Sequence, residues 1–223
     1  PAKDARCPMA DMVTADDVRK QKALYPKATV VCYVNTTAEV KAECDVCCTS
    51  ANAVKVVENV PSDTILFFPD RNLAGYVQRF TQKRVIPWPG YCYVHRKFKA
   101  DEITAAHSTC HGATIVVHPE CDPEVIDLAD EVRSTGGMVK LAEESEKDRI
   151  VVGTEEGMIK RLQREYPEKE FYSLGPARVC VNMKKIRLED VYQSLLNMQY
   201  QVKLPEDTMN RARTSLEKMV QLV

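Results

Sequence analysis

The chain has 223 residues, 44% of them hydrophobic, and a formal net charge of −1 from 31 basic and 32 acidic side chains. This balance creates no global field that would draw the protein to nucleic acid or to an anionic membrane surface. No apolar stretch approaches the roughly 20 residues that span a bilayer, and no signal-peptide pattern opens the chain. The composition therefore predicts a cytoplasmic protein with no nucleic-acid and no membrane partner.

The predicted elements of the first part of the chain alternate between helices and short apolar strands. Thr14 and Asp17 have the spacing of a capping box, and the segment 87–90 (P-W-P-G) ends the pattern shortly before Cys92. In chain order the elements are a helix from Thr14 to about Tyr25, a strand at Thr29–Tyr33, a helix opened by Thr36 and Thr37, a short strand at Asp45–Cys48, a helix over 49–58, a strand at Thr64–Phe68 and a helix over 72–80.

The next part of the chain repeats this pattern in a register of 85 residues without gaps. Ala28–Asn35 lies over Ala113–Glu120, and Asp63–Asp70 lies over Asp148–Glu155. Short apolar strands that alternate with helices predict pseudo-symmetric, repeated three-layer α/β/α units, each with a short three-stranded parallel sheet. The elements of this copy are a strand at Thr114–Val117, a helix at Pro123–Asp130, a short strand at Glu131–Arg133, a helix after Ser134, a strand at Ile150–Val152 and a helix at Glu156–Glu165.

The C-terminal part of the chain departs from the repeat. After Cys180 the register is lost, and residues from about Leu188 to Val223 are predicted as two helices separated near Pro205. We therefore expect four parts: residues 1–7 as the end of a preceding domain, 8–92 and 93–180 as α/β repeat units, and 181–223 as a helical segment.

The chain contains nine cysteines, an odd number without the density of a small disulfide-stapled domain. Reduced thiols, some of them metal ligands, fit this pattern better. Cys44 and Cys47 have C-x-x-C spacing, but they lie in an apolar run, where a free cysteine acts as a small buried hydrophobe. Three others, Cys7, Cys92 and Cys180, are separated by 85 and 88 residues and so mark the ends of the repeat units.

These three cysteines admit three interpretations. Structural zinc prefers four ligands, usually in close pairs. Three single thiolates from separate units suit an iron–sulfur cluster in which one iron has no protein ligand. Such an open iron acts as a Lewis acid on a hydroxyl or carboxylate oxygen, which favours dehydration chemistry. The spacing also fits structural cysteines at domain junctions.

Polar side chains gather where the predicted strands end. Tyr33 and Asn35 follow the first strand of one unit, and His118 and Glu120 have the same positions in the other. Ligands of open parallel sheets bind beyond the carboxyl ends of the strands, so we expect these four residues to share one site. A carboxylate beside an imidazole suits proton transfer, and we expect burial to raise the pKa of Glu120. Tyr33 and Asn35 also fit an ordinary strand aromatic and a turn residue.

Hydroxyl side chains are expected to open the helices that follow the second strands. Ser50 has this place in the first unit, and Ser134 with Thr135 in the second. Each is explained equally well as a helix N-cap or as a contact to an anion, for which Gly136-Gly137 allow close approach of backbone N–H groups. The sequence leaves both interpretations open.

Nine motifs between Cys7 and Lys184 resemble the quinolinate synthase family in composition and order. They are C-P-M-A-D-M (Cys7–Met12), Y-V-N-T-T-A-E-V-K-A (Tyr33–Ala42), C-T-S-A-N-A-V (Cys48–Val54), F-P-D-R-N-L-A (Phe68–Ala74), G-Y-C-Y-V-H (Gly90–His95), H-P-E-C (His118–Cys121), S-T-G-G-M (Ser134–Met138), G-T-E-E-G (Gly153–Gly157) and C-V-N-M-K (Cys180–Lys184). The resemblance implies α/β domains around a [4Fe–4S] cluster. It implies condensation of iminoaspartate with dihydroxyacetone phosphate to quinolinate, with loss of phosphate and water, in NAD biosynthesis. L-Aspartate oxidase or aspartate dehydrogenase would supply the iminoaspartate.

The resemblance also implies a role for each candidate residue. The cluster ligands would be Cys7, Cys92 and Cys180, and the acid–base residue would be Glu120. The intermediate would be oriented by His118, Tyr33 and Asn35. Its carboxylates or phosphate would be bound by Ser50, Ser134 and Thr135. The family's first domain, which carries a His-x-Tyr-Gln motif and an active-site serine, has no counterpart in this sequence. We therefore expect the C-terminal helices to pack on that domain and the chain alone not to turn over.

Two other functions stay open on the residues themselves. One is another [4Fe–4S] hydro-lyase that acts on a hydroxy acid, which would not require a phosphate-bearing substrate. The other is a small-molecule-binding module without catalysis, against which the pair His118 and Glu120 argues.

Overall fold

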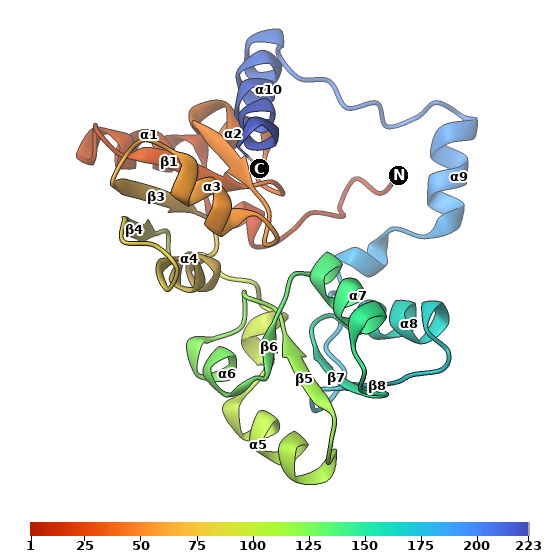
Figure 1. Cartoon of the computed structure of the whole chain (residues 1–223). Coiled ribbons are helices and arrows are strands. Elements are labelled where there is room, and N and C mark those ends of the chain that lie inside the picture. Colours follow the sequence, from red (N-terminus) through yellow and green to blue (C-terminus); the bar gives the residue numbers. More distant parts are fainter. Residues whose placement is uncertain (223) are drawn as a thin grey trace.

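The protein contains two four-stranded parallel sheets, with strand orders β2-β1-β3-β4 and β6-β5-β7-β8. The structure is a computed structural model, and it describes residues 1–222. Figure 1 shows the two sheets in two separate α/β units, one above the other. The predicted repeated α/β fold is thus confirmed.

The first unit follows the predicted order of elements. Its elements are the 3₁₀ helix η1 (Ala10–Met12), α1 (Ala15–Leu24), β1 (Thr29–Tyr33), α2 (Ala38–Glu43), β2 (Val46–Cys48), α3 (Ala53–Asn59), β3 (Thr64–Phe68), α4 (Arg71–Gln78) and β4 (Arg84–Pro87). Thr14 and Asp17 form the predicted capping box at the start of α1, and Thr37 caps α2 through the N–H of Val40. Local side-chain chemistry therefore sets where these helices begin.

The second unit has the same order. Its elements are the 3₁₀ helix η2 (His95–Lys97), α5 (Ala100–Thr109), β5 (Thr114–Val117), α6 (Pro123–Leu128), β6 (Glu131–Val132), α7 (Thr135–Glu144), β7 (Arg149–Gly153), α8 (Glu156–Glu165) and β8 (Glu170–Ser173). The bounds predicted for β1, β3, β5 and α8 are confirmed, and those of β2, β6, β7 and α6 differ by one or two residues.

The prediction of three strands per sheet is wrong, because β4 and β8 each add a fourth. Every residue of β4 is exposed or half-buried, and only Phe171 in β8 is buried. Neither strand therefore shows the continuous apolar run that identifies a central parallel strand. β4 also ends at Pro87, which cannot donate a ladder hydrogen bond and is tolerated only at such an edge.

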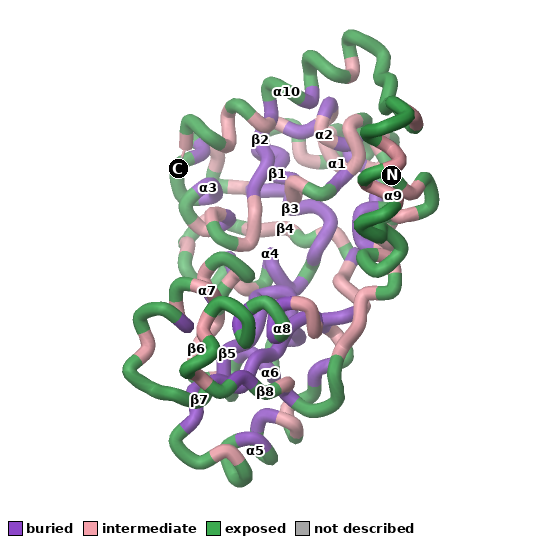
Figure 2. Tube along the Cα trace, turned by 90° about the vertical axis from the view of Figure 1, so that its right-hand side faces the viewer, coloured by how far each residue is buried: buried purple, intermediate pink, exposed green. Residues whose placement is uncertain are grey.

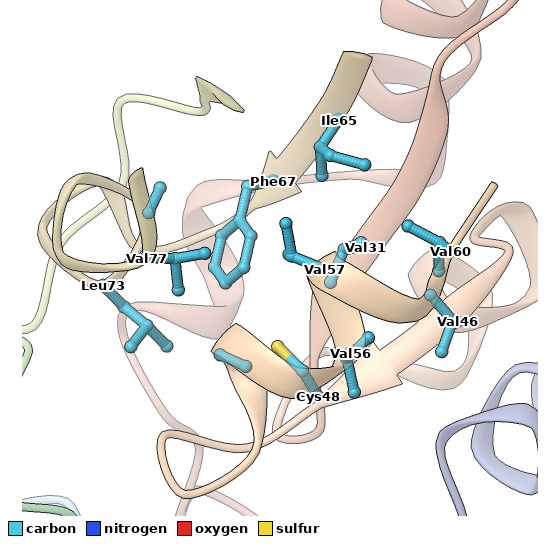
Figure 3. Close-up of a cluster of buried hydrophobic side chains, with 12 residues drawn as sticks. Val31, Val46, Cys48, Val56, Val57, Val60, Ile65, Phe67, Leu73 and Val77 are labelled. Atoms are coloured by element: carbon cyan, nitrogen blue, oxygen red, sulfur yellow. The ribbon is translucent and has the colours of Figure 1, made fainter. Parts of the chain in front are cut away.

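Each sheet is covered by helices on both faces. In the first unit Val31 and Phe67 face α3 and α4, in the cluster that Figure 3 shows, whereas Val30 and Leu66 face α1 and α2. The second sheet likewise packs α5 and α6 on one face and α7 and α8 on the other. Burial of each such side chain stabilises the folded state by about 1.5–3 kcal/mol. The helices on the two faces of each sheet therefore hold in place the strand ends that carry polar residues.

All nine cysteines are free thiols, and five of them are buried, among them Cys44, Cys47, Cys48 and Cys121. Cys32 Sγ lies 3.7 Å from Cys47 Sγ, in the core between the first sheet and its helices. The C-x-x-C segment therefore packs as apolar side chains, as predicted.

The C-terminal segment forms the 3₁₀ helix η3 (Met183–Lys185) and the two predicted helices, α9 (Leu188–Leu196) and α10 (Glu206–Gln221). α10 packs against α2 and β2 of the first unit, a contact that the sequence did not predict. α9 stands apart from both sheets in Figure 1 and is mostly exposed in Figure 2, where the strands are largely buried. Among residues 1–222, no helix is both long and apolar enough to cross a bilayer.

Candidate functional site

A cavity of about 630 Å³ lies where the residues that follow β1, β5 and β7 meet the three spaced cysteines. Most of the candidate residues line it, although they come from distant parts of the sequence. They are Cys7, Tyr33, Asn35, Cys92, His118, Glu120, Thr135 and Cys180. The fold thus brings the polar strand ends of both units and the three cysteines to one place.

The three lining cysteines share one local structure. Each is followed three residues later by a 3₁₀ helix (η1, η2 or η3) and eight residues later by an α-helix (α1, α5 or α9). The carbonyl oxygens of Cys7, Cys92 and Cys180 accept hydrogen bonds from the N–H four residues on, at 3.2, 3.1 and 3.3 Å. The repeat therefore continues past Cys180 to α9, where the sequence register was lost.

The donor set fits an iron–sulfur cluster held by three thiolates. Cys7, Cys92 and Cys180 are half-buried and open to the cavity, unlike the five buried cysteines. No other cysteine of residues 1–222 lines the cavity, and structural zinc would prefer four ligands. Among the described residues, the donor atoms of Cys92, His95 and Glu120 form a group within 4.8 Å of one another, which is a second possible metal site. This group shares Cys92 with the three-cysteine set. A hydrogen bond between His95 Nδ1 and Glu120 Oε2 accounts for the short distance between those two side chains.

Glu120 is held by a histidine that the sequence analysis missed. His95 Nδ1 lies 2.9 Å from Glu120 Oε2, and its Nε2 lies 2.9 Å from Thr154 Oγ1. The His95 ring stacks on His118 with 4.3 Å between centroids. All four side chains are buried. His95 stands in the G-Y-C-Y-V-H motif, but only the 3₁₀ turn after Cys92 points it to Glu120.

The pKa of Glu120 is lowered, so the expectation that burial would raise it is wrong. Burial does oppose the carboxylate, but the imidazoles of His118 and His95 and the hydrogen bond with Tyr33 outweigh it. For His95, burial opposes the charged form, yet hydrogen bonds with Cys92 and Glu120 raise its pKa to about 10. Burial and the neighbouring His95 lower the pKa of His118 to about 3. The group therefore contains an ionised carboxylate beside one charged and one neutral imidazole.

The neutral tautomer of His118 follows from its two hydrogen bonds. Its Nδ1 accepts from the backbone N–H of Glu120 at 3.3 Å, so Nε2 carries the proton that faces Ser50 Oγ at 3.2 Å. Tyr33 neighbours Ser50 and Glu120, and burial and the Glu120 charge raise the pKa of its phenol. Asn35 Nδ2 lies 3.5 Å from Cys7 Sγ. His118 and Tyr33 are thus hydrogen-bond donors beside Glu120.

The three hydroxyl candidates differ in what the structure gives them to do. The expectation that Ser50 opens a helix is wrong, because α3 begins at Ala53 after a turn. Ser134 does cap α7, where its Oγ accepts from the N–H of Gly137 at 3.1 Å. Thr135 lines the cavity itself. Capping therefore accounts for Ser134 but not for Ser50, whose hydroxyl contacts His118.

Basic side chains add positive charge to the cavity wall. Arg6, Arg161 and Lys184 all line the cavity, and the sequence analysis had assigned none of them. Lys184 Nζ pairs with Glu155 Oε1 at 3.0 Å. Arg6 and Arg161 are likewise paired, with Asp11 and Glu165, so a ligand carboxylate or phosphate would compete with these partners for the charges of the wall.

The chain is similar to quinolinate synthases over its whole length. Residues 1–221 match the family model described as Quinolinate synthetase A protein. A quinolinate synthase from Methanoregula boonei is 48% identical over 222 residues, which are 100% of this chain and 74% of that protein. One from Clostridium kluyveri is 46% identical over 223 residues, and one from Dehalococcoides mccartyi is 49% identical over 222, with the same shares covered.

Proposed function

Because the chain belongs to the quinolinate synthetase A protein family, we propose that it condenses iminoaspartate with dihydroxyacetone phosphate to quinolinate in NAD biosynthesis. The reaction releases phosphate and two waters. One observation carries the proposal: three separated thiols and the buried group of Glu120, His95 and His118 line a single cavity with basic walls. An L-aspartate oxidase or aspartate dehydrogenase would supply the unstable imine.

Cys7, Cys92 and Cys180 would hold a [4Fe–4S] cluster through their thiolates. When bound, the cluster supplies an iron without a protein ligand, a Lewis acid for hydroxyl or carboxylate oxygens. The common turn behind each cysteine supports this assignment, since it presents three thiols in the same way.

Glu120 is the proton acceptor and donor for the condensing substrates. Its Oε2 is oriented by His95 Nδ1, which in turn is fixed by Thr154. His118 Nε2 and the Tyr33 hydroxyl donate hydrogen bonds to substrate oxygens, and Ser50 fixes the His118 ring in the absence of substrate. Proton transfer is thus assigned to Glu120 and the side chains that contact it.

Anionic groups of the substrates are bound by the basic part of the cavity wall. Arg161 and Lys184 provide the charge, with the hydroxyl of Thr135 beside them in the wall. Asn35 completes the wall next to Cys7. Ser134 supports this surface from behind, because it holds the start of the helix that carries Thr135. Ser50 contacts His118 instead, and neither serine is part of the lining.

An anaerobic assay with both substrates tests the proposal in the iron-loaded complete enzyme, because the chain alone is expected not to turn over. Glu120→Gln should lower quinolinate formation by about 10²–10⁴-fold, since the amide cannot accept the proton, and should leave the iron content unchanged. Cys92→Ser should lose iron and activity together. Wild-type activity in Glu120→Gln, or product formed without the phosphate group on the substrate, would contradict the proposed reaction and favour another hydro-lyase.

We also propose that α9 is the first helix of a third α/β unit, which packs on it in the complete enzyme. α9 has the position of α1 and α5 after a cysteine, and Val191 corresponds to the buried Val18 and Ile103. Leu188, at 86% exposed, begins its uncovered face. The chain alone should then not turn over, whereas the full-length Methanoregula boonei relative should. Equal rates for the two iron-loaded proteins would contradict this part of the proposal.

A further inference from the structure

Two carboxylates at equivalent positions contact two of the lining cysteines through the backbone. Asp70 follows β3 and caps α4, and Glu155 follows β7 and caps α8. One oxygen of each makes the cap: Asp70 Oδ1 accepts from Leu73 N at 2.7 Å, and Glu155 Oε2 accepts from Gly157 N at 2.7 Å. The caps alone would need only one oxygen each.

The second oxygen of each carboxylate reaches the next cysteine loop. Asp70 Oδ2 accepts from the N–H of Cys92 at 3.0 Å, and Glu155 Oε1 accepts from the N–H of Cys180 at 3.2 Å. Both carboxylates are buried, Asp70 at 0% and Glu155 at 8% exposed. In their ionised forms both carboxylates accept charge-assisted bonds, which are about twice as strong as neutral ones, although burial and the Glu120 charge raise the pKa of Asp70 to about 7.

In both units a backbone hydrogen bond also connects the start of the helix with the loop before the cysteine. Arg71 N donates to Gly90 O at 2.9 Å, and Glu156 N donates to Arg178 O at 2.9 Å. At Gly90 a Cβ would lie 2.5 Å from Pro69 O, so only glycine allows this close approach. In both units, therefore, the start of a helix and a cysteine loop are held together by one backbone bond and one carboxylate.

We propose that Asp70 and Glu155 are positioning residues for the metal-binding cysteines, each fixing one cysteine by its backbone N–H. This inference rests on the proposed cluster site. The N–H and the Cβ of a cysteine share one Cα, so an anchored N–H restricts where the thiol can lie. Groups that orient metal ligands in this way commonly change metal affinity by about 10–100-fold when they are removed.

Amide hydrogen exchange in cluster-free protein tests the contact directly. Asp70→Asn keeps an oxygen that accepts from Leu73 N, because asparagine caps helices as well as aspartate does. Its side-chain NH₂ group cannot accept the hydrogen bond from the N–H of Cys92. Exchange at Cys92 should become at least about 10-fold faster and exchange at Cys180 should not change. Glu155→Gln should give the reverse pattern. Unchanged exchange at both cysteines would overturn the proposal.

Iron release to a chelator from the loaded protein tests the consequence. Asp70→Asn and Glu155→Gln should each release iron about 10-fold faster than wild type. Asp70→Glu should restore slow release, since a glutamate spans the same two contacts in the second unit. Thr14→Ala, which removes a helix cap that touches no cysteine, is the matched control.

The outcomes separate this inference from the proposed function. If Thr14→Ala releases iron as fast as Asp70→Asn, general loss of stability explains the effect and the positioning role is wrong. If the wild-type chain takes up no iron while the exchange pattern holds, the proposed cluster is wrong and the carboxylate contacts stand. If Asp70→Asn does not fold, Glu155→Gln gives an independent measurement at the more accessible site.

Discussion

Helices α5 and α9 begin eight residues after Cys92 and Cys180, but their surroundings differ. In both, a carboxylate at the third helical position, Glu102 or Asp190, accepts a hydrogen bond at 3.0 Å from the N–H of the N-cap residue. α5 buries Ile103 at 0% exposed against the second sheet, whereas α9 buries none of its side chains. Helix boundaries are thus set by local chemistry, and burial is set by whether a sheet is present to pack against.

The largest effect on the free energy of unfolding should come from a side chain by which α5 packs on its sheet. Ile103→Ala removes side-chain atoms that are fully buried among β5, α5 and α6, and it should lower the free energy of unfolding by about 2–5 kcal/mol. Urea denaturation followed by circular dichroism measures this loss. The exposed Thr104→Ala on the same helix is the control and should change little. A loss under 1 kcal/mol for Ile103→Ala would mean that α5 is not anchored by its sheet.

A smaller difference in the free energy of unfolding is expected between substitutions of the two capping carboxylates, Glu102 and Asp190. Glu102 also accepts from Arg178 Nη2 at 2.6 Å in a largely buried pair, so Glu102→Ala should cost about 1.5–3 kcal/mol. Asp190 only accepts from the N–H of Arg187 at 3.0 Å, so Asp190→Ala should cost about 0.5–1 kcal/mol. Thermal denaturation of both variants gives the difference. A double-mutant cycle with Arg178→Ala should assign the excess to the ion pair, and zero coupling would contradict it.

The smallest effect should come from the apolar face of α9. Leu195 is 69% exposed, so Leu195→Ala should change the free energy of unfolding by less than about 0.5 kcal/mol. Urea denaturation at two protein concentrations measures it and controls for self-association through this face. A loss above 1 kcal/mol at low concentration would show that α9 packs on the described units in solution.

The central strands were predictable because they are continuous apolar runs. Thr29–Tyr33 and Thr114–Val117 are buried on both faces and need no partner to be recognised. The edge strand Arg84–Pro87 was missed because its side chains are half-exposed. The shared cavity of Tyr33 and Glu120 also followed from sequence, since parallel topology alone brings the carboxyl ends of strands together.

The electrostatics of the site could not be predicted in the same way. The direction of the Glu120 pKa shift depends on His95, which lies 25 residues earlier and reaches it through a 3₁₀ turn. The second partner of Asp70 is likewise set by where the loop before Cys92 returns to β3. Such contacts depend on loop paths, for which the hydrophobic periodicity carries no signal.

The origin of the cavity wall has a thermodynamic consequence. Cys7 and Cys92 precede the first helices of the two α/β units and Cys180 precedes α9, so neither unit has the complete wall by itself. Any group that binds all three thiols binds only the arrangement in which these segments lie together, and by mass action it stabilises that arrangement. Occupancy of the cavity and the mutual placement of the two units are therefore linked, so that a bound group should raise the free energy needed to separate them.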